Sequence, residues 1–137
     1  MTLNDIDDQL QQKSGLLGLG GSADIAELLR SDEPAARESV AVYVHRLCGS
    51  IAAMTASLGG LDVLAYTGGV GQNVPELRAR VAQRLSYLGI EIDHDANAGA
   101  AADADISGAG GAVRTLVVTD REDLMIAEET RPLLRDL

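Results

Sequence analysis

Residues 61–77 carry the pattern best suited to ligand chemistry, a short apolar run that passes through glycines into a predicted helix. Residues 61–67 (LDVLAYT) favour a buried strand, and residues 67–73 (TGGVGQN) lead from it to the helix. Glycines at such a junction let a phosphate or a sugar approach the backbone, and a helix N-terminus favours an anion. Open α/β sheets bind ligands at the carboxyl ends of their strands. The alternative is a tight turn that needs glycine only for its shape.

This glycine segment matches neither of the common nucleotide fingerprints. Residues 69–74 (GVGQNV) lack the third glycine of GxGxxG, and GxxxxGK[ST] occurs nowhere in the chain. Lys13 is the only lysine, and its sequence context is not that of a phosphate loop. Neither a Rossmann dinucleotide site nor a P-loop is therefore predicted.

Other reactive side chains have simpler interpretations. His45 and Cys48 lie three residues apart on a predicted helix, but no third orienting group accompanies them, which favours a core cysteine beside a surface histidine. Residues 93–95 (DHD) could ligate a metal, yet their place in a polar loop favours solvated side chains. A solvated face is also expected for three arginines of the helix predicted at 75–88: Arg78, Arg80 and Arg84.

Composition and charge exclude several classes of partner. The 137 residues carry a formal net charge of −10, the wrong sign for binding nucleic acid or an anionic membrane. Phe and Trp are absent, so no aromatic platform for single-stranded nucleic acid is expected. Neither a signal peptide nor a membrane span is predicted, and a single cysteine agrees with a reducing, cytoplasmic location. We expect one domain, residues 1–137.

The first half of the chain is predicted to be helical. Residues 5–13 favour a polar helix, and residues 14–22 (SGLLGLGGS) favour a glycine-rich loop whose leucines indicate close packing. Residues 24–30 favour a short helix with Ser22 as its N-cap. Residues 33–58 carry the strongest helical pattern, with a proline in the first turn and two glycines at the end.

The helix predicted at 33–58 has two apolar sides. One is a stripe of larger residues: Val40, Val44, Leu47, Ile51 and Met54. The other consists of small residues: Ala41, Cys48, Ala52 and Ala56. One side can cover a sheet, whereas the second would face water in a monomer, so we expect a homodimer with this helix near the two-fold axis. The alternative is a monomer in which the helix at 5–13 covers the second side.

The second half alternates strands and helices. The strand at 61–67 is followed by a helix at 75–88, strands at 90–92 and 113–119, and a surface loop at 93–111 with a short strand at Ile106. The closing helix, at 122–134, has an expected apolar side: Leu124, Met125, Ala127 and Leu134. This order predicts an α/β fold, a mostly parallel sheet flanked by helices. Because few strands are visible, the chain is expected to belong to a larger protein or to dimerise.

Four segments together resemble the C-terminal half of acetate and propionate kinases, in order and with familiar spacing. They are SGLLGLGGSAD from Ser14, GGLDVLAYTGGVGQN from Gly59, LRARVAQRLSYLGIEID from Leu77 and LVVTDREDLMIAEET from Leu116. The resemblance covers residues 14–130, and TGGxGxN preceded by GGLD is its most specific part. It implies a ribonuclease-H-like fold of the actin-like ATPase type, in which ATP lies between two domains.

The resemblance also implies a function. Acetate kinases transfer the γ-phosphoryl group of ATP to acetate or propionate, reversibly and with Mg²⁺. This chain is similar to the half that binds nucleotide and forms a homodimer. The N-terminal kinase domain, with the acceptor pocket, is expected to lie outside it, so the chain alone is expected to be inactive. The alternatives are a non-catalytic, degenerate domain that binds nucleotide or oligomerises, and a scaffold without a ligand.

Three groups of residues acquire roles through this resemblance. Glu122 matches an acid that helps to hold Mg²⁺, although on its own it indicates a helix N-terminal carboxylate stabilised by the dipole. The segment that lines the adenosine pocket is matched by Asp24, Ile25 and Ala26. The loop that holds the phosphate and ribose region is matched by Gly69, Val70, Gly71, Gln72 and Asn73. From its position alone, Asn73 is also expected to cap the following helix.

The chain departs from the usual residues of the family in three segments. Gln72 stands where glutamate is usual, Ala26 where arginine is usual, and the closing Thr-Asn-Glu-Glu is replaced by residues 120–123 (DRED). Together with the absence of half of the cleft, these differences predict weak binding of ATP or ADP to the isolated chain.

Overall fold

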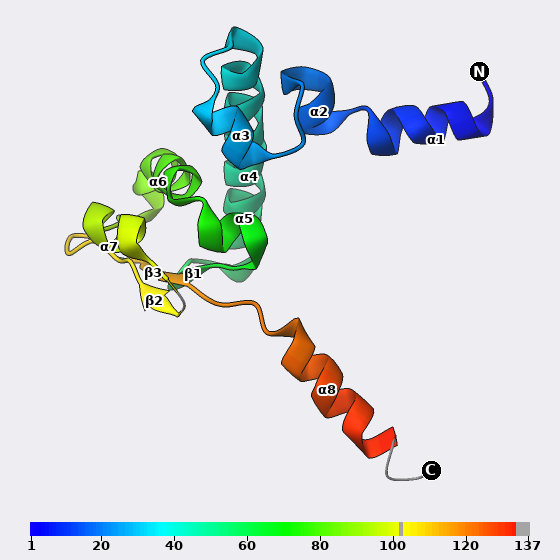
Figure 1. Cartoon of the computed structure of the whole chain (residues 1–137). Helices are drawn as coiled ribbons and strands as arrows, with labels where there is room; N and C mark the ends of the chain where they lie inside the picture. The colour runs from blue at the N-terminus through cyan, green and yellow to red at the C-terminus, as the bar shows by residue number, and fades with distance from the viewer. Residues whose placement is uncertain (102, 134–137) are drawn as a thin grey trace.

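The computed structural model describes residues 1–101 and 103–133, and its first half is helical, as predicted (Figure 1). Thr2 caps the first helix through reciprocal hydrogen bonds with Asp5. This helix buries none of its residues and projects from the body, so it does not cover the second side of the long helix. The four helices are α1 (Leu3–Gln12), α2 (Gly15–Gly20), α3 (Ile25–Arg30) and α4 (Pro34–Leu58).

The glycine-rich segment at 14–22 is largely helical, which corrects the prediction of a loop. Gly21 ends α2 in the left-handed conformation, with φ of +81°. The expected close packing is confirmed, because a Cβ on Gly20 would collide with Ser39 Oγ on α4. Glycine at this position lets the two helices approach.

Helix α4 matches the prediction at 33–58 almost to the residue. Pro34 occupies its first position, and Gly59 ends it with φ of +75°. Val44 of the expected stripe is buried, whereas Met54 near the end of the helix is 59% exposed. Cys48, which we expected on the side facing a partner, is buried in the core. The reason is that Cys48 lies one turn after Val44 and continues its row.

Within the described residues, the sheet has three strands in the order β1-β3-β2: β1 (Val63–Tyr66), β2 (Ala104–Asp105) and β3 (Arg114–Val117). β1 and β3 are parallel, with Tyr66 opposite Val117, whereas β2 is antiparallel to β3. The α/β class is therefore confirmed, but the sheet is mixed rather than mostly parallel. The ribonuclease-H-like assignment stays a prediction.

The strand expected at 90–92 is reduced to two isolated bridges. Ile90 pairs with Val113 in the parallel sense, and Ile92 pairs with Ser107 in the antiparallel sense. Because the two bridges have different partners and opposite directions, no continuous ladder forms. This is why the sheet has one parallel pair of strands rather than several.

Short helices lie between β1 and β2: α5 (Gly68–Asn73), α6 (Pro75–Arg84), the 3₁₀ helix η1 (Ser86–Leu88) and α7 (His94–Gly99). Helix α8 (Glu122–Leu133) follows β3. The helix predicted at 75–88 thus continues as a 3₁₀ turn after Arg84. The predicted surface loop at 93–111 contains α7, which Asp93 caps by accepting a hydrogen bond from Ala96 N–H (2.8 Å). The short strand expected at Ile106 is β2, one residue earlier.

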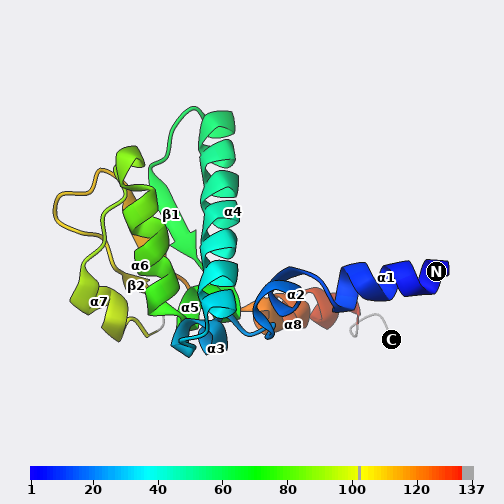
Figure 2. The ribbon, with the colours of Figure 1, turned by 90° about the horizontal axis from the view of Figure 1, so that it is seen from above.

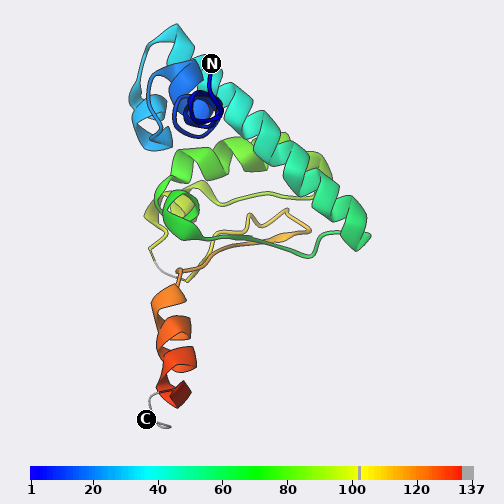
Figure 3. The same ribbon diagram turned by 90° about the vertical axis from the view of Figure 1, so that its right-hand side faces the viewer.

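Helices α4 and α6 lie side by side over one face of the sheet (Figures 2 and 3). The core between them includes Val81 of α6 and Val117 of β3, both fully buried. On the other face of β1, Val63 and Ala65 are exposed, and no helix in the described ranges packs there. The expectation that both faces are covered is therefore not met within residues 1–101 and 103–133.

The last helix, α8, leads away from the body and buries no residue (Figure 3). Its expected apolar side is in solvent, because Leu124, Met125 and Ala127 are all exposed; Leu134 lies outside the described residues. None of the described helices combines the length and the hydropathy that crossing a membrane requires.

Candidate functional site

The carboxyl ends of β1 and β3 meet at one edge of the sheet, because the two strands are parallel. Val118 N–H donates to the carbonyl oxygen of Tyr66 (2.8 Å) and closes their pairing there. A cleft of about 520 Å³ opens at this edge, where ligands bind in open α/β sheets. It is lined by residues from both strand ends and from α8: Thr67, Thr119, Asp120, Arg121, Glu122, Met125 and Ile126.

The glycine segment at this edge is the short helix α5. Backbone conformation or packing requires glycine at two of its positions, Gly68 and Gly71. Gly68 has φ of +69°, a conformation that other residues rarely adopt. A Cβ on Gly71 would lie 3.3 Å from the carbonyl carbon of Tyr66. A Cβ on Gly69 would meet no atom within 4 Å, and its φ is not positive. The space beside Gly69 is therefore open to a ligand.

Asn73 does not cap α6, which corrects the prediction. Its Nδ2 donates to the carbonyl oxygen of Gly69 (2.9 Å), across one turn of α5. The N-cap of α6 is Val74, which has no side-chain acceptor for the free N–H groups. Asn73 therefore stabilises the glycine turn itself rather than the helix that follows.

Gln72 joins the glycine turn to the segment after β3. In the amide orientation that satisfies both of its polar atoms, the side-chain oxygen accepts from Asp120 N–H (2.9 Å) and from Gly68 N–H (3.2 Å). Residues 48 positions apart in the chain are thereby held together at the edge of the cleft. The arrangement brings the predicted phosphate loop to the segment that carries Glu122.

Two carboxylates line the cleft beside this bridge. Asp120 and Glu122 are both exposed, and Asp120 Oδ1 accepts a hydrogen bond from Glu122 N–H (3.2 Å). Thr119 Oγ1 is buried and has no hydrogen-bond partner among residues 1–101 and 103–133. Within the described ranges no three His, Cys, Asp or Glu residues gather as a metal cage. This donor set fits Mg²⁺ held by one or two carboxylates together with phosphate oxygens.

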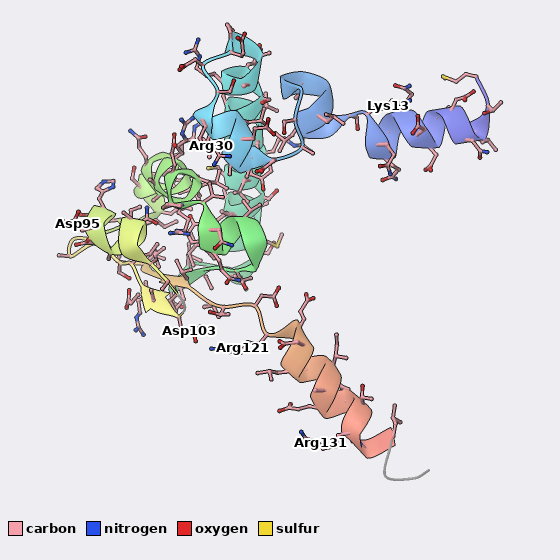
Figure 4. All side chains as sticks on the ribbon, viewed as in Figure 1. Lys13, Arg30, Asp95, Asp103, Arg121 and Arg131 are labelled. Atoms are coloured by element: carbon pink, nitrogen blue, oxygen red, sulfur yellow. The ribbon has the colours of Figure 1, made fainter. Side chains whose placement is uncertain are left out.

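The cation nearest these carboxylates, Arg121, pairs with Asp103 (Figure 4). Asp103 also accepts from Thr119 N–H (3.0 Å). The hydrogen bond from Arg121, followed by that from Thr119, holds the pKa of Asp103 below its usual value, and the same carboxylate raises the pKa of Arg121. Arg121 therefore faces a carboxylate of its own chain.

The segment matched to the adenosine pocket forms the start of α3. Asp24, not Ser22, is the N-cap of α3, and its Oδ1 accepts from Ala26 N–H (2.8 Å). Ile25 is buried in the core, while Ala26 is half-buried against it. None of the three lines the cleft at the strand ends. Asp24 therefore has a local structural role, and Ile25 is turned away from any surface.

The Cys48–His45 pair and residues 93–95 form no reactive site, as the sequence indicated. Cys48 is buried, and burial raises the pKa of its thiol, whereas His45 is exposed. Asp93 caps α7, and both His94 and Asp95 are exposed.

Comparison with known proteins decides the family. The family model described as "Acetokinase family" matches residues 1–128 of the 137. The chain belongs to the acetokinase family. The resemblance seen in the glycine segment and in the closing segment is thus confirmed over nearly the whole sequence.

Relatives of this acetokinase-family chain are considerably longer. The acetate kinase of Rhodopseudomonas palustris (strain ATCC BAA-98 / CGA009) is 41% identical over 128 residues, which are 93% of this chain and 32% of the relative. The crystal structure of Porphyromonas gingivalis acetate kinase matches with a TM-score of 0.86 at 32% identity, over 98% of this chain and 35% of that one. A propionate kinase from Francisella tularensis subsp. tularensis SCHU S4 matches with a TM-score of 0.85 at 29% identity, over 94% and 34%. The chain spans about a third of the length of these relatives.

One residue near the glycine turn of this acetokinase-family chain was missed by sequence reasoning. Arg78 of α6 is 1% exposed, so the expectation of a solvated face is wrong for it, whereas Arg80 and Arg84 are exposed as expected. Its guanidinium donates to the carbonyl oxygens of Gly71 and Gln72, both at 2.7 Å. Burial lowers the pKa of Arg78. The available signal was its position one residue after Leu77, on the buried side of α6.

Proposed function

We propose that this chain is the nucleotide-binding part of an acetate kinase-like phosphotransferase, which converts ATP and acetate or propionate to ADP and the acyl phosphate. The observation that carries the proposal is the Gln72 bridge, which joins the glycine turn to Asp120, a residue that lines the cleft together with Glu122. Family membership and relatives named acetate kinase and propionate kinase support the reaction and leave two acceptors open. The activity needs segments beyond this chain, since the relatives are about three times its length.

Phosphoryl transfer depends on positioning and on neutralising charge. In the proposed complex, the N–H groups of Gly69 and Val70 face the nucleotide's phosphates, and the open space beside Gly69 admits them. Glu122 and Asp120 would hold Mg²⁺, since both residues line the cleft. Bound Mg²⁺ supplies positive charge to the phosphates.

The remaining family roles are kept as proposals. The segment from Asp24 to Ala26 forms one wall of the adenosine pocket through its exposed N-cap, although Ile25 itself lies in the core. Gln72 preserves the hydrogen-bond acceptor of the usual glutamate without its charge. Nucleotide affinity of the isolated chain is therefore expected to be weak, because only part of the binding cleft is present.

Titration with ADP tests the proposal, and glycine variants make the test specific. We expect the amide signals of Gly69 and Gly71 to shift in nuclear magnetic resonance spectra at millimolar ADP with Mg²⁺. Gly69→Ala should fold, because a Cβ there meets nothing, but should lose this response because the methyl group fills the ligand's space. Gly49→Ala is the matched control, since its Cβ also meets nothing and it lies in the middle of α4. Unshifted amides in the wild-type chain would remove the proposal.

A chimera separates an enzyme part from a non-catalytic domain. Residues 1–128 would replace the matching third of the Rhodopseudomonas palustris acetate kinase. We expect the chimera to form acetyl phosphate and the isolated chain to form none. A folded chimera that binds ADP but forms no acetyl phosphate would favour the degenerate, non-catalytic alternative.

The proposal includes a cytoplasmic homodimer, as the resemblance implies. α4 leaves Val42, Met54 and Leu58 exposed along its length. Of the small-residue side expected to meet a partner, Ala41 and Ala56 are exposed too, whereas Cys48 is buried. Sedimentation equilibrium at tens of micromolar measures the state directly, and a single species near 14 kDa would contradict the dimer. Met54→Glu tests whether α4 forms the interface, because it places a charge on an exposed position of this helix. Cys48→Arg cannot serve as this test, because it would disrupt the core.

A further inference from the structure

The guanidinium of Arg78 is buried among oxygen atoms that carry no formal charge. Nε donates to Asn97 Oδ1 (2.7 Å), Nη1 to the carbonyl oxygens of Gly71 and Gln72 (2.7 Å each), and Nη2 to the carbonyl oxygen of Asn97 (2.8 Å). None of the salt bridges found among the described residues includes it. A buried charge without a counter-ion is costly, so its four hydrogen bonds must be well formed to offset the loss of water.

Asn97 is held in the orientation that receives this cation. It is 4% exposed, and its Nδ2 donates to the carbonyl oxygen of Pro75 (2.9 Å). With Nδ2 engaged, Oδ1 is directed to Arg78. The side chain of Asn97 therefore fixes α7 against the start of α6, and Arg78 extends this network to the glycine turn.

The glycine turn depends on polar contacts of this kind, because α5 contains no buried residue. Two links hold it from opposite sides: the Gln72 side chain to Asp120, and the Gly71 and Gln72 carbonyl oxygens to Arg78. These carbonyls lie near the end of α5, where helix carbonyls lack partners in the helix itself. Arg78 satisfies them and also places a positive charge directly behind the turn, in a chain whose net charge is −10.

We propose that Arg78 is a positioning residue for nucleotide binding, which holds the glycine turn in its binding conformation and presents a buried positive charge to the phosphates through it. The inference rests on the proposed function, because it names the residue that prepares that site. Because Arg78 is proposed to hold the conformation of the turn, this part of the inference can be measured in the absence of nucleotide.

Four variants of the full 137-residue chain test this role. Arg78→Met removes the charge and the donors, while Arg78→Lys keeps the charge but not the planar fork. Arg80→Met is the matched control on the same helix, since Arg80 is exposed and pairs with the neighbouring Glu76. Val81→Ala opens a cavity at a fully buried position and lowers stability with the Arg78 contacts intact.

We expect amide hydrogen exchange at Asn73 and Val74 to accelerate in both Arg78 variants by about tenfold or more relative to Arg80→Met. ADP affinity should fall by about tenfold or more in Arg78→Met and less in Arg78→Lys. Val81→Ala should unfold at lower urea concentration yet keep the wild-type ADP affinity. If Val81→Ala and Arg78→Met lose ADP affinity in proportion to their lost stability, Arg78 is only a core residue and the inference is wrong.

The outcomes also separate this inference from the proposed function. Wild-type chain that binds ADP, with Arg78→Met binding equally well, overturns the positioning role alone. Wild-type chain that binds no ADP overturns the proposed function, while hydrogen exchange at the turn still decides whether Arg78 holds it. If Arg78→Met does not fold, Arg78→Lys and Asn97→Ala carry the same comparison, because Asn97→Ala removes one acceptor of the guanidinium. Unchanged exchange at the turn in both would contradict the inference.

Discussion

The side chain of Gln72 accepts a hydrogen bond of 2.9 Å from the backbone N–H of Asp120, and so connects the end of one parallel strand to the end of its neighbour. The same oxygen accepts from Gly68 N–H (3.2 Å), at the start of the turn to which Gln72 belongs. One acceptor atom thus sets both the curvature of the turn and its distance from the carboxylates of the cleft.

Replacing Gln72 by Ala should destabilise the chain by about 1 kcal/mol. The N–H groups of Asp120 and Gly68 would lose their side-chain acceptor and donate to water instead. Gln72→Glu should stabilise it at neutral pH, because an ionised acceptor makes stronger hydrogen bonds to the same N–H groups. These bonds lower the folded-state pKa of the introduced carboxylate, so this gain is present above pH ~5 and is lost as the pH falls. Urea unfolding at pH 7 and pH 4 measures both variants. Equal midpoints for all three proteins would show that the bridge contributes nothing.

Glu122→Gln should remove the Mg²⁺-dependent part of ADP binding. If Glu122 helps to hold the cation, the wild-type chain binds ADP more tightly with Mg²⁺ than with a chelator, by about tenfold or about 1.4 kcal/mol. Titrations in Mg²⁺ and in EDTA measure the difference in each variant. Glu128→Gln is the control, because Glu128 lies on the same helix and does not line the cleft. An undiminished Mg²⁺ effect in Glu122→Gln would remove the role assigned to Glu122.

Thr115→Val should stabilise the fold by about 1 kcal/mol. Thr115 is fully buried in β3, and its Oγ1 has no hydrogen-bond partner in the part of the chain that the structure describes, so the hydroxyl carries a desolvation cost without a compensating bond. Ser39→Ala is the contrasting variant, because that buried hydroxyl does donate, to the carbonyl oxygen of Ala36 (2.7 Å). Its removal should destabilise the chain. Urea midpoints that move in the same direction for both would contradict the distinction.

Asp105→Asn should cost stability at neutral pH and little in strong acid. The hydroxyl of Ser107, then its N–H, and then Arg114 lower the pKa of Asp105 to about 2. The folded-state pKa lies below the unfolded value of about 3.9, so the stabilisation is present above pH ~4 and is lost as the pH falls toward 2. Urea unfolding of both proteins across pH 2 to 7 gives the difference curve.

A second variant checks the cause assigned to this pKa. Ser107→Ala removes the largest contribution, so carboxyl signals in nuclear magnetic resonance titrations should show a higher pKa for Asp105 than in the wild-type chain. An unaltered pKa would mean that Arg114 alone holds the carboxylate in its ionised form.

The sequence was sufficient to predict most helices and two of the strands, because each has a local pattern. α4 follows from its apolar row between Pro34 and Gly59, and β1 and β3 follow from short apolar runs. The errors arose in segments whose secondary structure depends on contacts with distant segments. Residues 90–92 are apolar enough for a strand, but their neighbours lie in opposite directions and give only bridges. The helix at Gly15 was hidden because its stability comes from contact with α4, which permits glycines that would otherwise indicate a loop.

For the candidate site, sequence reasoning located the segments but not the contacts between them. The glycine turn and Glu122 were both selected, and the parallel pairing of β1 and β3 brings their segments to the same edge of the sheet, although no residue of α5 itself lines the cleft there. The bridge from Gln72 to Asp120 could not be predicted, since it depends on strand register. Arg78 was missed for a related reason: a charged residue is expected in water unless acceptors such as Asn97, far away in the sequence, are known to face it.

Arg78 and Asn97 lie 19 residues apart in the chain and belong to one hydrogen-bond network. Replacing either residue alone leaves the other without one of its hydrogen-bond partners. Loss of the arginine leaves the Asn97 oxygen without its donor, and loss of the asparagine leaves a buried guanidinium short of one acceptor. A substitution at one of the two positions should therefore favour a compensating substitution at the other. In aligned acetokinase sequences, substitutions at positions 78 and 97 should covary, even among sequences whose glycine turn is identical.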